Sequence, residues 1–522
     1  MGLLSIQAIR RILGMHFNEL SAILYGLLED NPIIAIQEAN KLDDSQKLQL
    51  LRAAILIDAG AAIGSHDDVL KGVEIMERAV NAKPDEQTNK YNLANGYHAL
   101  AMTTKMECPQ WYSSTYHYRL KARKLFYDVA INPNALTEIQ TQAFTNLGNL
   151  LWSSYRWVEA YDVYRQALSV NSQNGVASAG ALKILRYAYS IHIGDKDLLA
   201  NEIESLATHV RENIDVISKY SGIGVVQGIL EEIKDIPNGA ISKKFSPQDE
   251  FEKFVLAHSL TLSPTIHRNK HDKKRWDELT IYSVVIPNRN VHQIPEVYAM
   301  FNVMKADYIL ARKVLFDGIN KNFEDTGTYA DTLNYANYGI QSSMLTLAQR
   351  ASLDVLDKIA VATLAFLDVK NARKASFKTA WYKPKKSKVR AYLSEVEGEI
   401  EKGNTALLAI VEIANDLSEA MGFLKAKQDT RNSSTHRFTV LHDFTVNLDT
   451  SSECLEHKDQ QHFISESIET LQLARSALVY FVQMIDIFCC RFEEEHEGLI
   501  ATLEVPSHEF IRHGENGNEL KD

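Results

Sequence analysis

The 522-residue sequence has only four cysteines, and no two of them form a Cys-x-x-Cys pair. Cys108 stands alone, whereas Cys454, Cys489 and Cys490 lie near the other end. Thiols so few and so scattered argue against a disulfide framework and against structural zinc. We therefore expect a cytoplasmic protein with no bound metal.

The sequence also lacks a long uninterrupted apolar run. Its longest candidate, residues 476–490, is broken by Gln483 and Asp486, which predicts a buried helix and not a membrane span. The first twenty residues have neither a sustained apolar core nor a small-residue cleavage site, and Ile6 stands where a myristoylation signal needs Ser or Thr. We expect no membrane contact.

Motifs of nucleotide folds and zinc hydrolases are absent. There is no Gly-x-Gly-x-x-Gly, no Walker loop and no His-Glu-x-x-His, and no strand-rich segment of any length. Hydrophobic residues make up 45% and charged residues 24%, which is ordinary for a folded chain. The length suggests several domains, and we expect an all-α fold without a cofactor.

Basic residues are outnumbered, with 56 Lys and Arg against 67 Asp and Glu and a net charge of -11. A general nucleic-acid coat is therefore excluded, and any contact with a polyanion must come from a local patch. Residues 370–390 hold nine Lys and Arg, no acid, and Phe377 among other aromatics. This composition suits backbone contacts with base stacking, although a lysine loop is often only a solvated surface. The predicted RNA-binding residues are Trp381, Tyr382, Lys383, Lys385, Lys386, Lys388 and Arg390.

A period of 34 residues runs through the first half. Gly60 and Ala94 occupy the same small-residue position, and Gly148 occupies it again after an insertion. Small residues let antiparallel helices approach while large ones fill the gap to the next pair. The pattern resembles tetratricopeptide repeats, which implies an α-solenoid over residues 1–235 whose surface binds a protein or peptide trigger. An array that serves only as a spacer remains the alternative.

Prolines are scarce, 11 in all, yet five of them fall in residues 237–295 beside a basic polar stretch. This crowding predicts a connecting segment over residues 236–295. Beyond it, apolar residues recur at helical spacing, which predicts a helical bundle over 296–505 and a polar tail over 506–522. The expected architecture is a TPR-like α-solenoid followed by a helical bundle.

An arginine followed five positions later by a histidine is a candidate catalytic pair. It occurs four times, as Arg11/His16, Arg431/His436, Arg437/His442 and Arg491/His496. Arg11 and His16 would point about 140° apart on an ideal helix. The last pair encloses glutamates that would repel a phosphate, which predicts a solvated helix end. The third encloses the apolar run FTVL, so one member should face a core.

Arg431/His436 differs because the residues between them are polar throughout and favour a bend that lets the two side chains converge. Arg431, Asn432 and His436 match the motif of HEPN superfamily ribonucleases, which is Arg, a polar residue, three residues and His. The resemblance covers roughly residues 296–500. A polar insertion over residues 447–462 departs from the strongest members of the superfamily.

This resemblance implies a HEPN helical bundle with metal-independent endoribonuclease activity on RNA. His436 would act as general acid or base on the 2′-hydroxyl or the leaving 5′-oxygen, and Arg431 would bind the scissile phosphate. Asn432 would orient one of them or contact substrate. Histidine and arginine are the side chains that supply a mobile proton and a fixed cation near neutral pH. A surface Arg and His in a polar loop are the plain alternative.

The resemblance further implies a role as a toxin or antiviral defence effector, with the repeats as a sensor that gates the bundle. Because one motif supplies only one histidine, we expect a homodimer through the HEPN domain that brings two motifs together. The alternative is a noncatalytic scaffold whose repeats bind protein and whose bundle binds RNA or nucleotide.

Overall fold

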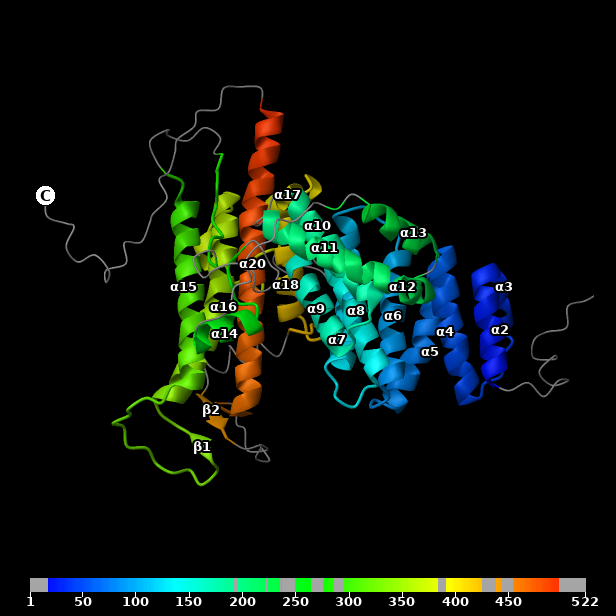
Figure 1. Cartoon of the computed structure of the whole chain (residues 1–522), viewed down its shortest axis with the longest axis horizontal. Helices are drawn as coiled ribbons and strands as arrows, with labels where there is room; N and C mark the ends of the chain where they lie inside the picture. Colours follow the sequence, from blue (N-terminus) through cyan, green and yellow to red (C-terminus); the bar gives the residue numbers. More distant parts are fainter. Residues whose placement is uncertain are drawn as a thin grey trace, which may run out of the picture.

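The computed structural model describes residues 17–191, 196–221, 223–234, 236, 249–263, 276–285, 294–383, 391–424, 438–443 and 454–496. Helices dominate these segments, and they form a solenoid on one side and a bundle on the other (Figure 1). The predicted all-α class, a helical solenoid followed by a helical bundle, is confirmed. The assignment of the solenoid helices to the tetratricopeptide type stays a prediction.

The solenoid is a row of helices joined by short turns. They are α2 (Phe17–Asp30), α3 (Pro32–Ala39), α4 (Gln46–Ile63), α5 (His66–Ala82), α6 (Gln87–Thr103), α7 (Gln110–Ala130), α8 (Thr137–Ser153), α9 (Trp157–Val170), α10 (Gly175–Ser190), α11 (Lys196–Glu212), α12 (Ile214–Ser221) and α13 (Ile223–Glu232).

Capping residues fix several of these helix ends. The side chains of Asn31, Ser65 and Asn174 accept hydrogen bonds from backbone N–H groups in the first turns of α3, α5 and α10, which satisfies donors that a helix start leaves open. Helix α4 ends at Gly64, whose φ of 70° lies in the left-handed region that favours glycine. Local sequence thus sets the hairpin boundaries.

Small residues let neighbouring solenoid helices approach, as the 34-residue pattern predicts. A Cβ at Gly148 of α8 would lie 2.6 Å from the ring of Tyr164 on α9, and a Cβ at Gly180 of α10 would lie 2.4 Å from the same ring. Tyr164 is buried between the two glycines. The packing reason for the small positions is therefore confirmed at this contact.

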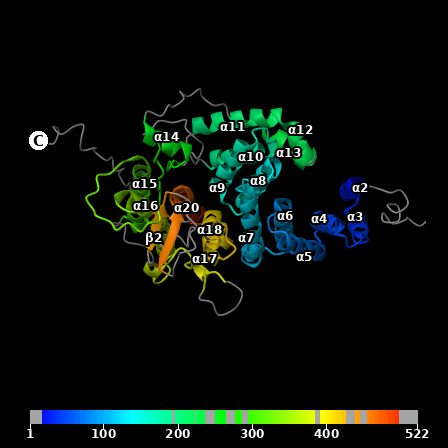
Figure 2. The same ribbon diagram turned by 90° about the horizontal axis from the view of Figure 1, so that it is seen from below.

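The bundle contains α14 (Glu250–Ala257), α15 (Glu296–Asn320), α16 (Ile340–Phe366), α17 (Ser394–Glu401), α18 (Thr405–Ser418) and α20 (Gln460–Glu495), with a short 3-10 turn at Ala372–Lys374. Figure 2 shows α20 between α16 and α18, with α7 and α9 of the solenoid beyond them. The bounds of α15, α16 and α20 agree with the helical periodicity of the sequence. A short turn over residues 402–404 separates α17 from α18.

A small sheet covers one end of the bundle, where the sequence predicts no strand. It consists of β1 (Ala336–Asn337), β2 (Phe438–His442) and β3 (Leu455–Asp459). Strand β2 pairs antiparallel with β1 and parallel with β3, with Val440 opposite His457. The strands are too short, and β3 too polar, to give a clear alternating pattern. The insertion over residues 447–462 thus contributes β3 and the first turn of α20.

The described part of the predicted connecting segment packs on the bundle. Helix α14 lies against α15, where the rings of Phe251 and Phe316 are 5.1 Å apart. Arg312 of α15 forms an ion pair with Asp277 at 2.7 Å, and the Tyr308 hydroxyl donates to the carbonyl of Leu260. Residues 249–263 and 276–285 therefore cover the bundle, and the domain boundaries themselves remain a proposal.

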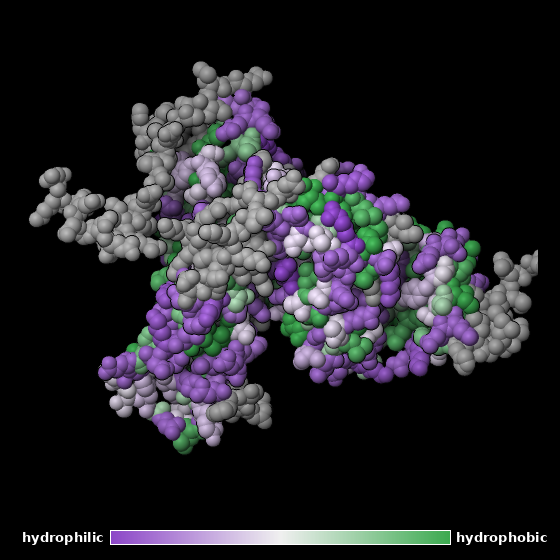
Figure 3. Space-filling model, viewed as in Figure 1, coloured by the Kyte–Doolittle hydropathy of each residue, from purple (hydrophilic) through white to green (hydrophobic). Residues whose placement is uncertain are grey.

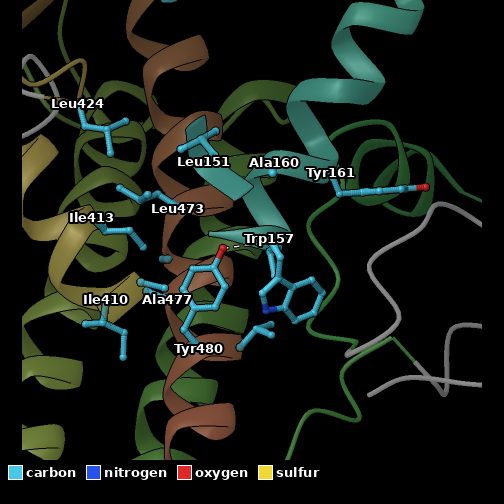
Figure 4. Packing of buried hydrophobic residues seen from close by; sticks show 14 of the residues in the cluster. Leu151, Trp157, Ala160, Tyr161, Ile410, Ile413, Leu424, Leu473, Ala477 and Tyr480 are labelled. Carbon is cyan, nitrogen blue, oxygen red and sulfur yellow. Dashed lines mark hydrogen bonds between the residues drawn. The ribbon is translucent and has the colours of Figure 1, made fainter. Parts of the chain in front are cut away.

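The solenoid and the bundle share one hydrophobic core. Figure 4 shows Trp157 and Ala160 of α9 facing Ala477 and Tyr480 of α20. The Trp157 indole donates to Gln483 Oε1 at 2.9 Å, and the backbone N–H of Val158 donates to the Tyr480 hydroxyl at 3.1 Å. The solenoid thus covers much of the apolar surface of α20.

Among the described helices, α20 is long and apolar enough to cross a membrane by length and composition. Most of its apolar window is buried against the other bundle helices and the solenoid. A buried helix is what the interruptions at Gln483 and Asp486 predict.

Candidate active site

The predicted catalytic residues Arg431, Asn432 and His436 lie outside the described residues. In the sequence they stand between Leu424, which ends the described stretch after α18, and Phe438, which begins β2. The structure therefore gives the elements on both sides of the motif. These elements are α18 before the motif and the sheet after it.

A histidine pair lies on the sheet directly after the motif. His442 is the last residue of β2 and only 1% exposed, whereas His457 in the middle of β3 is half-buried. The two rings meet with His442 Nε2 2.8 Å from His457 Nδ1. The other nitrogen of His442, Nδ1, is 2.9 Å from the backbone carbonyl of Asn334.

These contacts assign the protons of the neutral pair. A carbonyl oxygen only accepts, so His442 Nδ1 must carry a hydrogen and donate it to Asn334. The Nε2 of a neutral His442 then has a lone pair, and it accepts the Nδ1–H of His457. Burial, together with the neighbouring His442, lowers the pKa of His457 below its ordinary value. The neutral form of His457 is therefore favoured near pH 7.

The loop from α15 to α16 is fixed to the sheet beside this pair. Its segment β1 pairs with β2, and the Asn337 side chain donates to Asp443 and to Gln460, the latter at 3.0 Å. At the other end of the loop, Asp325 accepts the N–H of Ile340 at 2.9 Å. The carbonyl that orients His442 thus belongs to an anchored loop.

On the other side of the motif, α18 is held by three buried arginines of the solenoid. Arg119 and Arg123 of α7 both bind Glu412, Arg123 also binds Asp416 with its Nε 2.9 Å from Oδ2, and Arg156 binds Asp416. All five side chains have 1% exposure or less. We call these five residues the arginine clamp.

The arginine clamp keeps the Glu412 carboxylate ionised. Burial alone would raise the pKa of Glu412, but Arg119 and Arg123 outweigh burial and hold that pKa at about 2. Ion pairs without solvent add little net stability compared with apolar packing, but removing one partner is strongly destabilising. The clamp therefore fixes which surface of α18 meets the solenoid, just before the chain enters the motif segment.

The aromatic residues of the predicted RNA-binding patch are not exposed as the prediction requires. Trp381 is fully buried and its indole donates to the carbonyl of Phe377, which is itself buried. Tyr382 is half-buried, stacks on Tyr392 and donates its hydroxyl to Asn415. Trp381 is therefore a core residue, and the prediction that it stacks on bases is wrong, because its ring fills the bundle interior.

The basic part of the patch is only partly visible. Lys383 is exposed at its edge. The remaining predicted residues, Lys385, Lys386, Lys388 and Arg390, lie outside the described residues. Their role in binding RNA stays a prediction.

The three discounted Arg/His pairs have different outcomes. Arg11 and His16, and likewise Arg437, lie outside the described residues. His442 is buried, as the apolar run before it predicts. The end of α20 is exposed from Glu493 to His496, as predicted, but the side chain of Arg491 is only 15% exposed and pairs with Glu399 of α17 at 2.8 Å.

Sequence reasoning missed His457 and Asn334. His457 belongs to the polar insertion, where no periodicity marks a strand, and Asn334 acts through its backbone carbonyl, which no residue type reveals. Within the described segments, no three or more His, Cys, Asp or Glu side chains are grouped to hold a metal ion.

Comparisons with known proteins agree with the bundle. No curated protein and no solved structure matches the sequence. Residues 288–487 match the family described as LA2681-like HEPN. This segment begins just before α15 and ends within α20, so it contains the motif, the sheet and the histidine pair. The C-terminal half of the chain thus carries a domain similar to the LA2681-like HEPN family.

Proposed function

We propose that the protein is a metal-independent endoribonuclease of the HEPN type. The observation that carries the proposal is the match of residues 288–487 to that family together with Arg431, Asn432 and His436 in its motif order. HEPN domains are generally ribonucleases, and RNA is the proposed substrate. The proposed setting is a toxin or antiviral defence effector in the cytoplasm.

In this proposal Arg431 binds the scissile phosphate and stabilises its added charge in the transition state. His436 transfers a proton at the 2′-hydroxyl or at the leaving 5′-oxygen. Asn432 orients one of these groups or contacts the substrate. No metal or other cofactor is needed for this chemistry, because the imidazole and the guanidinium supply the proton transfer and the positive charge.

Purified full-length protein is incubated with total RNA in EDTA beside Arg431→Ala and His436→Ala. We expect cleavage by the wild type and a loss of at least about a hundredfold in each variant. Exposed residues of the same types, Arg78 on α5 and His496 after α20, provide matched alanine controls that should keep the wild-type rate. Intact RNA in every reaction would favour the noncatalytic scaffold.

The same proposal includes gating by the solenoid, supported by the arginine clamp. The clamp fixes α18, and the motif follows in the sequence after Leu424. A protein or peptide trigger on the solenoid surface would act by loosening these contacts. Asp416→Asn and Glu412→Gln weaken the clamp while keeping the side-chain shape, so we expect them to raise basal cleavage or toxicity on expression. Unchanged cleavage and toxicity in a folded clamp variant would count against gating.

A further inference from the structure

A cavity of about 560 Å³ lies at the end of the bundle where α17 is found, away from β1 and β2 (Figure 1). The start of α15, the end of α16, α17 and Phe488 of α20 line it, together with Val284 and Val285 of the segment before α15. Val285 is fixed there because its N–H donates to Cys489 Sγ of α20 at 3.3 Å. Small-molecule sites usually have volumes of about 300–1,000 Å³, so the cavity is large enough for a small organic ligand.

Part of the lining is apolar. Val297 and Met300 of α15, Phe366 of α16 and Phe488 of α20 belong to it. The two phenylalanine rings are 5.0 Å apart in an edge-to-face arrangement, and both are only half-buried. An apolar group bound against these rings would be removed from water, which favours binding.

The polar part of the lining has more negative than positive charge. It contains four carboxylates and one ammonium group, those of Glu296, Asp368, Glu395, Glu399 and Lys402. Glu399 is buried, and it is compensated by Arg491, whose Nη2 is 2.8 Å from Oε2, and by the Asn404 amide at 2.8 Å. The other three carboxylates of the lining stand against a single lysine, so the cavity favours a positively charged ligand.

Helix α17 brings charge and open space together on one face. Glu395 and Gly398 are three residues apart and therefore neighbours on the helix surface. The Ser394 hydroxyl donates to Glu395 at 2.8 Å, and this hydrogen bond lowers the pKa of Glu395, so the carboxylate is ionised at neutral pH. A Cβ at Gly398 would meet no atom within 4 Å. The helix thus leaves room for a ligand beside an ionised carboxylate.

We propose that this cavity is a binding site for a small organic cation with an apolar body, of the class of alkylammonium ions. The ammonium group donates charge-assisted hydrogen bonds to carboxylates of the lining. The apolar body packs on Phe366 and Phe488, whose rings also attract a nearby cation. A fatty acid or a nucleotide would bring negative charge to a lining that is already negative. The inference goes beyond the proposed ribonuclease function and does not depend on it, because the cavity shares no residue with the motif.

The test uses full-length protein and three probes with the same hydrocarbon chain, namely hexylammonium, hexanol and hexanoate. A ligand that binds only the folded state raises the unfolding temperature as its concentration increases, and isothermal titration calorimetry measures each affinity. We expect hexylammonium to bind at least about threefold more tightly than hexanol, and hexanoate to bind more weakly than hexanol. Equal affinities for hexylammonium and hexanol would overturn the assigned ligand class, and no binding of hexylammonium would overturn the site.

A substitution at Gly398 locates the bound probe. Gly398→Leu places a side chain in the open space of the cavity and should weaken the binding of hexylammonium by at least about tenfold. The matched control is Gly228→Leu on α13, where a Cβ also meets no atom within 4 Å, and it should keep the wild-type affinity. Both variants exchange a helical glycine for a good helix former, so both should fold. Unchanged binding in Gly398→Leu would place the probe elsewhere and overturn the inference.

A second variant tests the role of charge. The double substitution Glu296→Gln and Glu395→Gln removes two charges and keeps the side-chain shapes, so hexylammonium should lose most of its advantage over hexanol while the affinity for hexanol stays the same. Glu250→Gln changes an exposed carboxylate of α14 outside the cavity and should preserve the advantage. If the double variant preserves it as well, the carboxylates do not select the cation, and the assigned class is wrong.

Discussion

At the scale of single residues, the arginine clamp is a group of buried charges that is costly to disturb. Its three guanidinium groups and two carboxylates have no contact with solvent, so each depends on its partners for charge compensation. Removing one member of such a cluster leaves an uncompensated buried charge, at a cost of about 3–5 kcal/mol. Apolar contacts around Trp157 and the ion pair of Arg475 with Asp162 also attach the solenoid to the bundle.

Glu412→Gln should therefore lower the free energy of unfolding by about 3–5 kcal/mol at pH 7, because Arg119 and Arg123 keep their charges. Denaturant unfolding followed by far-UV circular dichroism measures the change. The matched control is Glu250→Gln, which removes an exposed ion pair with Lys253 and should have almost no effect. Equal effects of the two substitutions would mean that the clamp does not hold the two parts together.

The stability difference between the wild type and Glu412→Gln should depend on pH. The pKa of Glu412 is about 2 in the folded protein, against an ordinary value of 4.5, so the folded state holds the ionised form. The stabilisation is complete above pH 4.5 and is lost as the pH falls toward 2. The difference in unfolding midpoint between the wild type and Glu412→Gln should thus shrink over this range. A difference that stays constant from pH 6 to pH 3 would contradict the assignment.

Residue roles were predictable from sequence only where the residue type itself carries the chemistry. Arg431 and His436 stand out by their motif, whereas His457 needs the pairing of β2 with β3 to bring it to His442. For Trp381 the sequence prediction was wrong. Its basic neighbours predict an exposed position, whereas the structure buries its side chain in the core. Sequence position gives charge patterns, but burial depends on contacts between distant segments.

At the scale of elements, the approach of α8, α9 and α10 depends on two glycines around Tyr164. Gly148→Ala and Gly180→Ala should each destabilise the protein by about 1–3 kcal/mol, since the added Cβ would overlap the ring. Gly228→Ala is the matched control, because a Cβ there meets no atom within 4 Å and alanine favours a helix by up to about 1 kcal/mol. Thermal unfolding should shift in opposite directions for the two kinds of variant.

The helices could be predicted from sequence because each is long and periodic, whereas the sheet could not. Strand β1 has two residues, and β2 and β3 have five each, too few for an alternating pattern to stand out. The parallel pairing of β2 and β3 also joins a strand before the polar insertion to a strand within it. The site therefore depends on the part of the fold that carries the weakest local signal.

At the scale of the whole molecule, assembly of two chains through the HEPN domain remains our proposal. The solenoid covers α20, and Figure 3 shows a mixed surface with a few hydrophobic residues at the tip of the bundle. Around the sheet, Leu333 is 86% exposed, Tyr335 70% and Phe438 74%. Leu333 and Tyr335 directly precede β1, and Phe438 is the first residue of β2.

We predict a homodimer through this surface. Light scattering coupled to size exclusion should give about twice the chain mass of 58.9 kDa, and Phe438→Glu should yield the single-chain mass, because a charge would be buried at the interface. Met102→Glu changes an exposed side chain of the solenoid and should leave the dimer intact. If the wild-type protein has the mass of a single chain and still cleaves RNA, a site shared between two chains is excluded.

Removal of the solenoid tests gating less cleanly than the clamp variants. A chain without residues 1–235 should show altered toxicity on expression if the solenoid restrains the bundle. The truncation also uncovers the surface of α20 around Tyr480, so misfolding would mimic a functional effect. The folded clamp variants are therefore the decisive comparison.

Helix α20 joins distant parts of the molecule without a hinge. Its 36 residues span about 54 Å, it begins at the residue directly after β3, and its middle packs on Trp157 of the solenoid. A continuous helix is stiff along its axis, so an axial displacement at its middle also moves its N-terminal end. A shift of α20 by a fraction of an ångström would therefore move β3, and with it the ring of His457 against His442, by a similar amount.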